Sequence, residues 1–409
     1  MSTKPPQQPF ETFDQLAEVF REHVAPHKLA YYQRMGLQLV MGKREGIWFE
    51  DAYTKLRFIN CHCNGGVFSL GHCNPRVTAA VSNALGTLDI GNHHFLSGQR
   101  AELASRLSAT FDDALPRVVF GVSGGEAVDL AIKAARGATG RQGIVSVRGG
   151  YHGHTGLALA AGDAAFRDPF GPNLPGFVQV PFNDVKAMDS AIDDQTAAVL
   201  VETIPATLGM PIPEPGYFSA IRGLCDDRGA RLLVDEVQTG LGRTGAWWGI
   251  QHESVIPDAI ITGKGLSGGI YPITATLLSR EMHQAVDNES NPFVHISTYG
   301  GSELGCVAAQ AVLDIVGEPG FFERVTALSE RLQDAFAPLP FELRRRGLFM
   351  GLRFQSEMEA LGALMRILQR GVFCFPAGND RCVLQFLPPL ILSDEECEDL
   401  IARMTEAFA

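Results

Sequence analysis

The 409-residue sequence has little of what marks a membrane-spanning or a nucleic-acid-binding protein. No apolar stretch reaches the roughly 20 residues that a transmembrane helix needs. Positive charge is in the minority, with 34 Lys and Arg against 46 Asp and Glu and a net charge of −12. This balance excludes binding to nucleic acid or to an anionic membrane as the main role. Residues 1–9 are polar and rich in proline, which predicts a disordered tail rather than a signal peptide.

Cysteine is also scarce, since only eight are scattered along the chain. This usage indicates reduced thiols and predicts a cytoplasmic protein. The run Cys61-His62-Cys63, with Cys73 and the pair His93-His94, could be imagined as a metal site. Because its spacing matches no standard zinc pattern, we predict buried small thiols here and no metal.

Hydrophobic periodicity indicates how the chain is organised. Residues 11–35 have helical spacing, and residues 37–60 alternate like short strands of a hairpin. From about residue 75, strands and helices alternate, which is typical of a mainly parallel sheet covered on both faces. The expected strands are 117–121, 143–147, 177–181, 198–203, 231–235, 259–262 and 273–278. The expected helices are 75–86, 99–110, 125–137, 185–192, 216–228 and 303–316.

The last part of the chain, from about residue 320, has a different pattern. It mixes three helical segments with two short strand-like runs, which predicts a smaller α+β domain. The helices are expected at 320–336, 357–370 and 394–408, and the strands at 349–354 and 383–386.

A lysine stands at an unusual place, after the apolar run 257–262 and between two glycines. Lysine is normally a solvated surface charge, and burial lowers its pKa because it disfavours the ammonium form. A neutral amine at Lys264 is a nucleophile that can form a Schiff base with a carbonyl group. Taken alone, Lys264 is explained as well by a snorkelling surface lysine.

A second apolar run, residues 231–234, leads to a carboxylate at Asp235. A carboxylate so close to the core needs a cationic partner, although a single aspartate at a strand end can also cap a helix or a turn. Taken together, a Schiff-base lysine and an aspartate for a pyridinium nitrogen are the two groups that pyridoxal phosphate (PLP) chemistry requires of a protein.

Two glycine-rich turns lie earlier in the chain. The segment Phe120–Arg136 reads as a strand, a turn at Gly124 and Gly125, and a helix, whose first N–H groups can bind a phosphate. In the second turn Tyr151 follows two glycines, and its ring can lie flat on a heteroaromatic ring. Either turn alone is also explained as an ordinary loop, because glycines are common between strands and helices.

In this order of phosphate turn, aromatic residue, aspartate and lysine, the chain resembles the class III family of fold-type I PLP enzymes. That family includes ornithine and 4-aminobutyrate aminotransferases, and the 29-residue gap from Asp235 to Lys264 is typical of it. The resemblance covers nearly the whole chain and rests on Ser69–Pro75, Ser123–Ala127, Tyr151–Gly153, Val234–Gly240, Gly242–Gly245, Lys264, Thr298–Gly301 and Pro388–Leu390.

The resemblance implies an α/β fold of the fold-type I PLP-dependent transferases. A large PLP-binding domain with a mainly parallel seven-stranded sheet would span residues 61–318. Residues 319–409 would form a small α+β domain, which residues 1–60 would join. The resemblance also implies a homodimer with the active site at the subunit interface.

The resemblance also implies roles for the matched residues. Lys264 would carry the cofactor as a Schiff base, and Asp235 would keep the pyridine nitrogen protonated. Tyr151 and Val237 would lie on the two faces of the ring. The other cofactor-binding positions are Ser123, Gly124, Gly125, His152, Glu202, Gln238 and, from the neighbouring subunit, Thr298.

The substrate side departs from the family pattern at two positions. Many members read Glu-Pro-Val-Gln-Gly-Glu-Gly-Gly where this chain has residues 202–209, so Thr207 replaces their second glutamate. Many also read Leu-Arg before Pro-Pro-Leu, and that arginine binds a substrate carboxylate, but here Gln385 stands in its place. Loss of both is self-consistent, because either charge alone would be buried without a partner. Alternatively the alignment is shifted, and Arg34 or Arg57 binds the carboxylate.

The resemblance favours an aminotransferase in which Lys264 moves a proton between substrate and cofactor. A racemase, an aminomutase or a decarboxylase is the alternative on the same fold, although no Asp or Glu lies between Thr203 and Pro213 to serve as a second acid-base group. A PLP-binding regulatory protein without turnover is the alternative from another class. Phe95, Tyr299 and Phe386 are candidates for an apolar substrate region.

Overall fold

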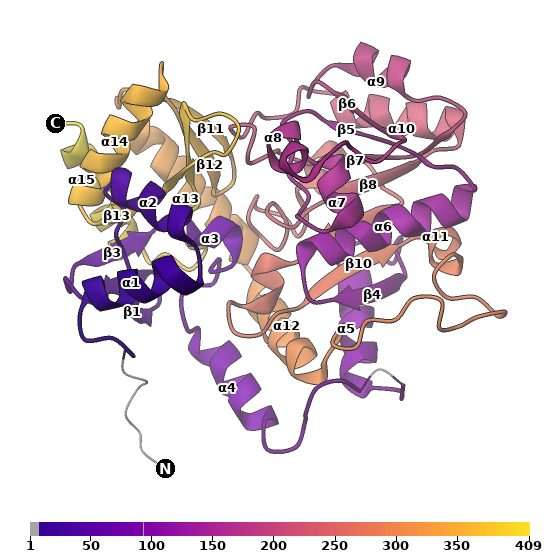
Figure 1. Ribbon diagram of the computed structural model, residues 1–409, viewed down its shortest axis with the longest axis horizontal. Coiled ribbons are helices and arrows are strands. Elements are labelled where there is room, and N and C mark those ends of the chain that lie inside the picture. The colour runs from indigo at the N-terminus through magenta and orange to yellow at the C-terminus, as the bar shows by residue number, and fades with distance from the viewer. Residues whose placement is uncertain (1–7, 93) are drawn as a thin grey trace.

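The computed structural model describes residues 8–92 and 94–409. The tail expected over residues 1–9 therefore lies almost entirely outside the described residues. Figure 1 shows two regions side by side, a larger one built around a twisted sheet and a smaller one that holds the first and the last helices of the chain.

The larger region is built on a sheet to which seven of the described strands belong, in the order β4-β10-β9-β8-β7-β5-β6. Strands β6, β5, β7, β8 and β9 pair in parallel, whereas β10 is antiparallel to both of its neighbours. The mainly parallel seven-stranded sheet expected from the sequence is thus confirmed. Its strands are β4 Arg117–Gly121, β5 Gly143–Val147, β6 Phe177–Val180, β7 Thr196–Glu202, β8 Arg231–Asp235, β9 Ala259–Thr262 and β10 Thr274–Leu278.

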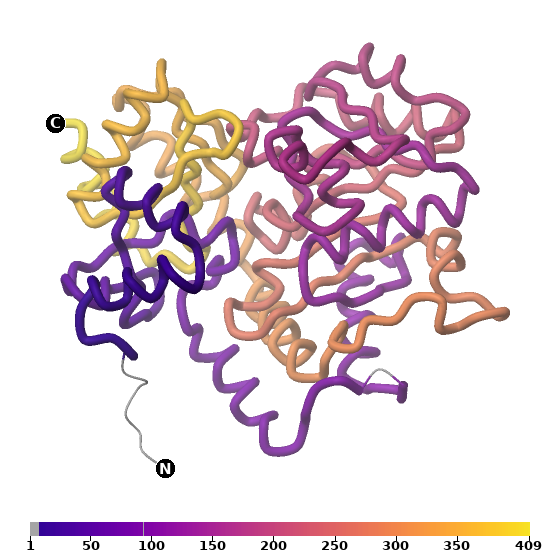
Figure 2. Tube along the Cα trace, viewed as in Figure 1, coloured from indigo at the N-terminus to yellow at the C-terminus, as the bar shows by residue number. Residues whose placement is uncertain are grey.

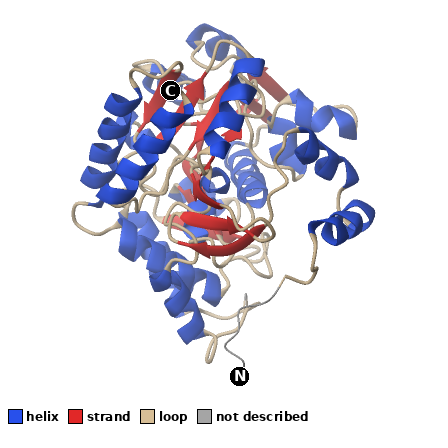
Figure 3. Ribbon diagram, turned by 90° about the vertical axis from the view of Figure 1, so that its left-hand side faces the viewer, coloured by secondary structure: helices blue, strands red, loops and turns tan. Residues whose placement is uncertain are grey.

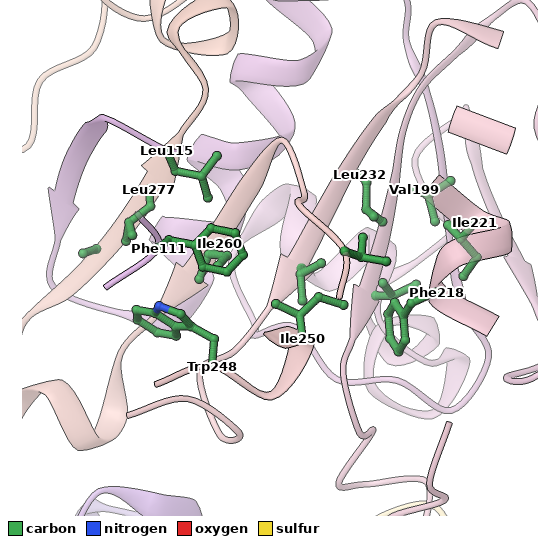
Figure 4. Close-up of a cluster of buried hydrophobic side chains, with 14 of the residues drawn as sticks. Phe111, Leu115, Val199, Phe218, Ile221, Leu232, Trp248, Ile250, Ile260 and Leu277 are labelled. Atoms are coloured by element: carbon green, nitrogen blue, oxygen red, sulfur yellow. The ribbon is translucent and has the colours of Figure 1, made fainter. Parts of the chain in front are cut away.

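Both faces of this sheet are covered by helices, because its central strands are apolar on both sides. Strand β7 is buried along its whole length. Its side chains alternate between two cores, with Val199 and Val201 in one and Ala198 and Leu200 in the other. Figure 4 shows the first core, in which Val199 and Leu232 face Phe218.

The helices of the large region divide between the two faces. The alanine-rich α6 Gly124–Thr139 packs closely on the second core together with α7 Gly156–Ala161 and α11 Arg280–Gln284. Residues of α5 Gly98–Ala109, α9 Val185–Ala191, α10 Tyr217–Arg228 and α12 Glu303–Val316 contribute to the first core. The other short elements are α3 Cys63–Gly66, α4 Pro75–Ala84, α8 Ala164–Arg167, η1 Asp168–Phe170, η2 Gly249–Glu253 and η3 Lys264–Ser267.

The smaller region contains two four-stranded sheets, β1-β2-β3-β13 and β11-β12-β15-β14. Figure 3, viewed from the side of this region, shows strands in the middle and helices around them. Its strands are β1 Met41–Glu45, β2 Trp48–Asp51, β3 Arg57–Asn60, β11 Glu342–Arg346, β12 Phe349–Arg353, β13 Val372–Phe373, β14 Phe375–Pro376 and β15 Val383–Phe386. Its helices are α1 Phe13–His23, α2 Pro26–Arg34, α13 Phe321–Phe336, α14 Glu357–Gln369 and α15 Asp394–Ala407.

The two ends of the chain meet in this smaller region. Strand β13 pairs in parallel with β3, and one core joins Leu37, Ile47 and Ile59 to residues of α13, α14 and α15. In Figure 2 the indigo start and the yellow end of the tube accordingly lie together. The division of the chain at residues 60/61 and 318/319 stays a prediction.

The single helix expected over residues 11–35 is wrong, because two helices form there. Helix α1 begins after Thr12, whose side chain accepts from Gln15 N, and α2 begins at Pro26. Proline has no N–H to continue a helix and disfavours the helical conformation in the residue before it, and Ala25 is accordingly non-helical at φ −161° and ψ 88°. Strand β11, which reads Glu-Leu-Arg-Arg-Arg, was not expected because it lacks an apolar pattern.

Within the described residues no single helix is long and apolar enough to cross a membrane. Helices α12 and α13 are long and apolar enough only when they are counted as one segment. Their axes are bent by 68° relative to each other.

Candidate active site

The predicted cofactor residues converge at one edge of the large sheet, where the parallel strands end. Glu202 ends β7, Asp235 ends β8, and Lys264 follows β9 by two residues. Ligands of open parallel sheets bind at this edge. A cavity of about 390 Å³ opens here, lined by Ser123, Gly124, Gly125, Tyr151, His152, Gly153, His154, Thr155, Glu202, Asp235, Val237, Gln238 and Lys264.

Lys264 lies just after the end of β9 and has an unusual backbone conformation. Its φ of 41° lies in the left-handed region, which costs a non-glycine residue free energy and marks a position that its surroundings enforce. Burial lowers the pKa of its ammonium group to about 8, against the opposing charges of Asp235 and Glu202. About a tenth of the amine is therefore neutral at pH 7, far more than at the ordinary pKa of 10.5, and the neutral form is what a nucleophile or a general base needs.

Asp235 is paired with a buried histidine that also lines the cavity. His152 Nδ1 lies 2.9 Å from Asp235 Oδ2, and Val237 N donates to the other carboxylate oxygen over 3.1 Å. Burial alone would lower the pKa of His152, but the hydrogen bond to Asp235 and the charges of Asp235 and Glu202 together raise it. His152 thus supplies the cationic partner that the sequence required for Asp235 and orients that carboxylate.

Glu202 is a second buried acid in the same place. Burial raises its pKa to about 7, against the opposing charge of His152 and with the added charge of Asp235. Its oxygens accept hydrogen bonds from Tyr151 N over 2.9 Å and from Ala206 N over 3.4 Å. Glu202 therefore ties the turn that carries Tyr151 to the end of β7.

In the glycine-rich turn at the start of α6, a side chain fits at Gly124 but not at Gly125. A Cβ atom on Gly125 would lie 2.7 Å from Thr155 Oγ1, whereas one on Gly124 would lie 3.6 Å from Val237 Cγ1, an ordinary contact. Ser123 is the N-cap of α6 and accepts from Glu126 N. The backbone at this helix start is thus exposed to the cavity and suited to an anion.

The residues of the cavity fit the cofactor expected from the sequence. Gln238 Oε1 and His152 Nε2 are buried and have no hydrogen-bond partner within the described part of the chain. Buried polar atoms without partners are uncommon, so the cavity provides unmet hydrogen-bonding groups beside the Lys264 amine. The helix start for a phosphate, the aromatic Tyr151 and the Asp235 carboxylate surround the same space.

Four predicted residues do not line this cavity. Thr207 turns its hydroxyl to Gly149 O at 2.8 Å, and the Gln385 amide donates to Ala206 O at 3.4 Å. Phe95 is 78% exposed, and Thr298 is exposed on the loop before α12. Their proposed contacts with substrate and cofactor are therefore not made by this arrangement of one chain.

Three further sequence candidates lie elsewhere. Phe386 is wrong as a substrate residue, because it is fully buried in the core of the smaller region and packs on Phe336 with ring centroids 5.7 Å apart. Arg57 stacks over Trp48 at 4.8 Å, and Arg34 is exposed in α2. Neither arginine lines the cavity.

Several residues near the site were not identified from the sequence. His62 is close enough to Lys264 for their charges to interact, and a Cβ on Gly65 would lie 3.3 Å from the Lys264 Nζ. The Asn64-Gly65-Gly66 run is the signal that could have found this turn, since all three residues have positive φ. Among the described residues, no group of three or more His, Cys, Asp or Glu side chains could hold a metal ion, and His93 lies outside them.

Two other unexpected residues stabilise the surroundings of the cavity. The buried Glu236 accepts from Thr203 Oγ1, Thr239 Oγ1, Gly249 N and Ile250 N, which fixes the loop after β8. The buried guanidinium of Arg243 donates to Ser69 Oγ and to two backbone carbonyls of the smaller region, Leu348 O and Pro388 O.

Comparisons with known proteins agree on one family. A family model described as Aminotransferase class-III matches residues 31–408. An uncharacterized aminotransferase of Archaeoglobus fulgidus is 47% identical over 402 residues, which cover 96% of this chain and 94% of the relative. The acetylornithine aminotransferase of Methanopyrus kandleri is 36% identical over 392 residues, 95% of this chain and 98% of the relative.

A solved structure of the ornithine aminotransferase from Toxoplasma gondii matches with a TM-score of 0.88 and 27% identity. The match covers 98% of this chain and 95% of that chain, and the structure is described as having partial occupancy of PLP at its active site.

Proposed function

The chain belongs to the class III aminotransferases, PLP-dependent enzymes of fold type I, and we propose that its catalytic centre is the cavity around Lys264. One observation carries this assignment: a buried amine with a pKa lowered to about 8 shares a cavity with a histidine-paired aspartate and an open helix start. Their position at the edge of the sheet where ligands bind supports this proposal.

Each group of the cavity has a proposed role toward PLP. When bound, PLP withdraws electrons from the carbon that carries the substrate amino group and so makes its proton acidic. Asp235, oriented by His152, would keep a proton on the pyridine nitrogen. Gln238 would use its free Oε1 to accept from the ring hydroxyl. The first N–H groups of α6, at Gly124 and Gly125, would hold the phosphate.

Three further residues shape the space around the ring. Tyr151, whose position is fixed through Glu202, would cover one face. Val237, which lies beside the start of α6, would cover the other face. Both side chains exclude water from the centre, which strengthens the electrostatic effect of Asp235 there.

Lys264 moves the proton of the reaction. Its neutral amine would take a proton from the amino-bearing carbon of the substrate, and the resulting ammonium would give a proton back on the cofactor side of the amino nitrogen. The pKa of about 8 suits both directions, because the neutral and the charged form are both well populated near pH 8. The outcome is the exchange of an amino group between an amine or amino acid and an oxo acid.

The substrate side is proposed to differ from that of relatives that hold a carboxylate with an arginine. Gln385 and Thr207 stand at the two positions where many members of the family have an arginine and a glutamate, and both donate from their side chains to backbone carbonyls. The enzyme would accordingly not hold glutamate and 2-oxoglutarate in the usual way of the family.

The active unit is proposed to be a homodimer with the cavity at the subunit interface. Exposed apolar side chains gather at Ile90, Phe95 and Leu96 and along the segment Phe293–Tyr299, and these two places meet where the His94 and Phe293 rings lie 6.3 Å apart. Exposed apolar patches of this kind mark association surfaces. Thr298 lies within the second segment. In the dimer, Thr298 of each subunit would reach the phosphate site in the cavity of the other subunit.

The proposed compartment is the cytoplasm. All eight cysteines lie within the described residues and are free thiols, six of them buried. Free thiols persist in a reducing compartment.

The test uses purified holoenzyme and single amines or amino acids, without an acceptor. Conversion of the cofactor to its amine form, with release of a carbonyl product, is the expected result. Loss of optical activity with an unchanged cofactor spectrum would instead establish a racemase. A protein that takes up no PLP would overturn the assignment of the cavity.

A further inference from the structure

The segment that follows β7 is bound to the smaller region through its carbonyl groups. Asn379 N and Asp380 N, in the loop before β15, donate to Thr207 O over 2.8 and 3.2 Å. Arg344 Nη1, in β11, donates to Gly209 O over 2.7 Å. The position of Thr207 is therefore determined by the smaller region as well as by the strand that it follows.

The buried carbonyl of Gly149 accepts two hydrogen bonds from this junction. Thr207 Oγ1 donates to it over 2.8 Å, and Asn379 Nδ2 donates to it over 2.9 Å. Two residues later the chain reaches Tyr151, whose N–H donates to Glu202. The turn that carries Tyr151 is thus held at Gly149 by side chains from the junction and at Tyr151 by the end of β7.

A second contact connects the same loop with the ring of Tyr151. This ring packs edge-on against Phe166 of α8, with centroids 5.4 Å apart and planes at 81°. Gly378 belongs to the loop, and a Cβ there would lie 3.5 Å from Phe166 Cζ. In Figure 1 helix α8 accordingly lies on the side of the large region that faces β11 and β12. The loop therefore contacts both the turn of Tyr151 and the ring that packs on it.

The two donors act at a distance from the cavity. Among the described residues, neither Thr207 nor Asn379 lines it, whereas Tyr151 does. A side chain that contacts a ligand keeps its place only when the hydrogen bonds and the packing around it are in place. A change at Gly149 O would therefore reach a ligand through the ring of Tyr151.

We propose that Thr207 and Asn379 are positioning residues that set the place of Tyr151 over the cofactor ring. Through them the smaller region controls how tightly PLP is bound, although none of its described residues lines the cavity. This inference rests on the proposed function, because it needs PLP in the cavity with Tyr151 on one face of its ring.

The first experiment titrates cofactor-free protein with PLP. Thr207→Val and Asn379→Leu each remove one donor to Gly149 O and nearly keep the size of the side chain. Each should weaken PLP binding about threefold and the double variant about tenfold, because the carbonyl keeps one donor in each single variant. Thr207→Ser, which keeps the hydroxyl, should restore most of the affinity lost in Thr207→Val. Unchanged affinity of the double variant would overturn the proposal.

The same double substitution in a Tyr151→Ala background separates positioning from general stability. If the two donors act through the ring of Tyr151, their loss should cost no further affinity once that ring is absent. A tenfold loss in both backgrounds would mean that Thr207 and Asn379 only stabilise the fold, which would refute the proposal. Asn173→Leu is the matched control, because the Asn173 amide also donates to a backbone carbonyl, Ala160 O at 3.3 Å, and it should bind PLP like the wild type.

Hydrogen exchange of the cofactor-free protein gives a result even if a variant takes up no PLP. The peptide over residues 147–154 should exchange about tenfold faster in the double variant than in the wild type, because the turn has lost its support at Gly149. Equal exchange of this peptide in the two proteins would contradict the proposal. A wild-type protein that takes up no PLP would instead overturn the proposed function itself, so the two failures are distinguishable.

Discussion

Lys264 is held between two glycines at a positive φ, and its amine lies beside the start of the Asn64-Gly65-Gly66 turn. Replacement by alanine removes the group proposed to move the proton while leaving Asp235 and His152 in place. We expect Lys264→Ala to lower the rate of cofactor conversion about a thousandfold, within the range of lost acid-base catalysis. Lys186→Ala, at an exposed position in α9, should keep the wild-type rate. A Lys264→Ala enzyme that keeps most of its rate would contradict the assigned role.

The buried amine of Lys264 also affects stability and its dependence on pH. Its pKa falls from 10.5 to about 8 on folding, so between these pH values the unfolded chain binds more protons and stability rises with pH. Below pH 8 the full cost, about 3 kcal/mol, is present, and above pH 10.5 it is absent. Cofactor-free Lys264→Met should therefore be more stable than the wild type at pH 7, with a difference that disappears toward pH 10.5. Denaturant unfolding at a series of pH values measures this, and a constant difference would contradict it.

At the scale of the element, the start of α6 packs against the turn that carries His154 and Thr155. Gly125→Ala places a methyl group 2.7 Å from Thr155 Oγ1 and should cost about 1–3 kcal/mol of stability and weaken PLP binding. Gly124→Ala, one residue earlier, meets only an ordinary contact and should leave stability nearly unchanged. The double variant Gly125→Ala/Thr155→Ala should recover most of the loss. Thermal unfolding and PLP titration distinguish these cases, and equal effects of the two single variants would refute the packing explanation.

The positions at which the buried strands end were predicted best. The apolar runs before Asp235 and Lys264 are long enough to indicate buried strands, and the end of a buried strand determines where the next polar residue lies. The break between α1 and α2 was also readable in principle, because Pro26 interrupts the helical pattern. Strand β11 was not, since its residues are mostly charged and its place comes from pairing with β12.

The substrate side could not be predicted because its contacts join residues far apart in the chain. His62 looked like part of a cysteine-rich run, and only the folded chain brings it near Lys264 and near Gln385 in β15. Thr207 was identified by its position in a motif, yet its hydroxyl is bound to Gly149 O, a contact that no local pattern announces. Local motifs thus indicated the cofactor half of the cavity, whereas tertiary contacts determine the other half.

At the scale of the whole molecule, the exposed apolar segments around Phe95 and Phe293 are expected to associate with a second copy. Phe95→Asp places a charge in that surface and should convert the dimer to a monomer with weaker PLP binding. Phe170→Asp is a matched control, because Phe170 is as exposed as Phe95, at 78%, but lies in η1. Sedimentation velocity gives the mass of each variant. A Phe95→Asp protein that stays dimeric would place the interface elsewhere.

The parallel pairing of β3 with β13 has a consequence for folding during synthesis on the ribosome. Strand β3 ends at Asn60, and its partner begins at Val372, about 310 residues later. At typical synthesis rates, β13 is synthesised on the order of 15–60 seconds after β3. During that interval the edge of β3 and the apolar side chains of Ile47 and Ile59 lack their final cover. The nascent chain is therefore most exposed to aggregation at its oldest segment, and a chaperone that shields the first 60 residues would improve its yield more than one that acts on the finished sheet.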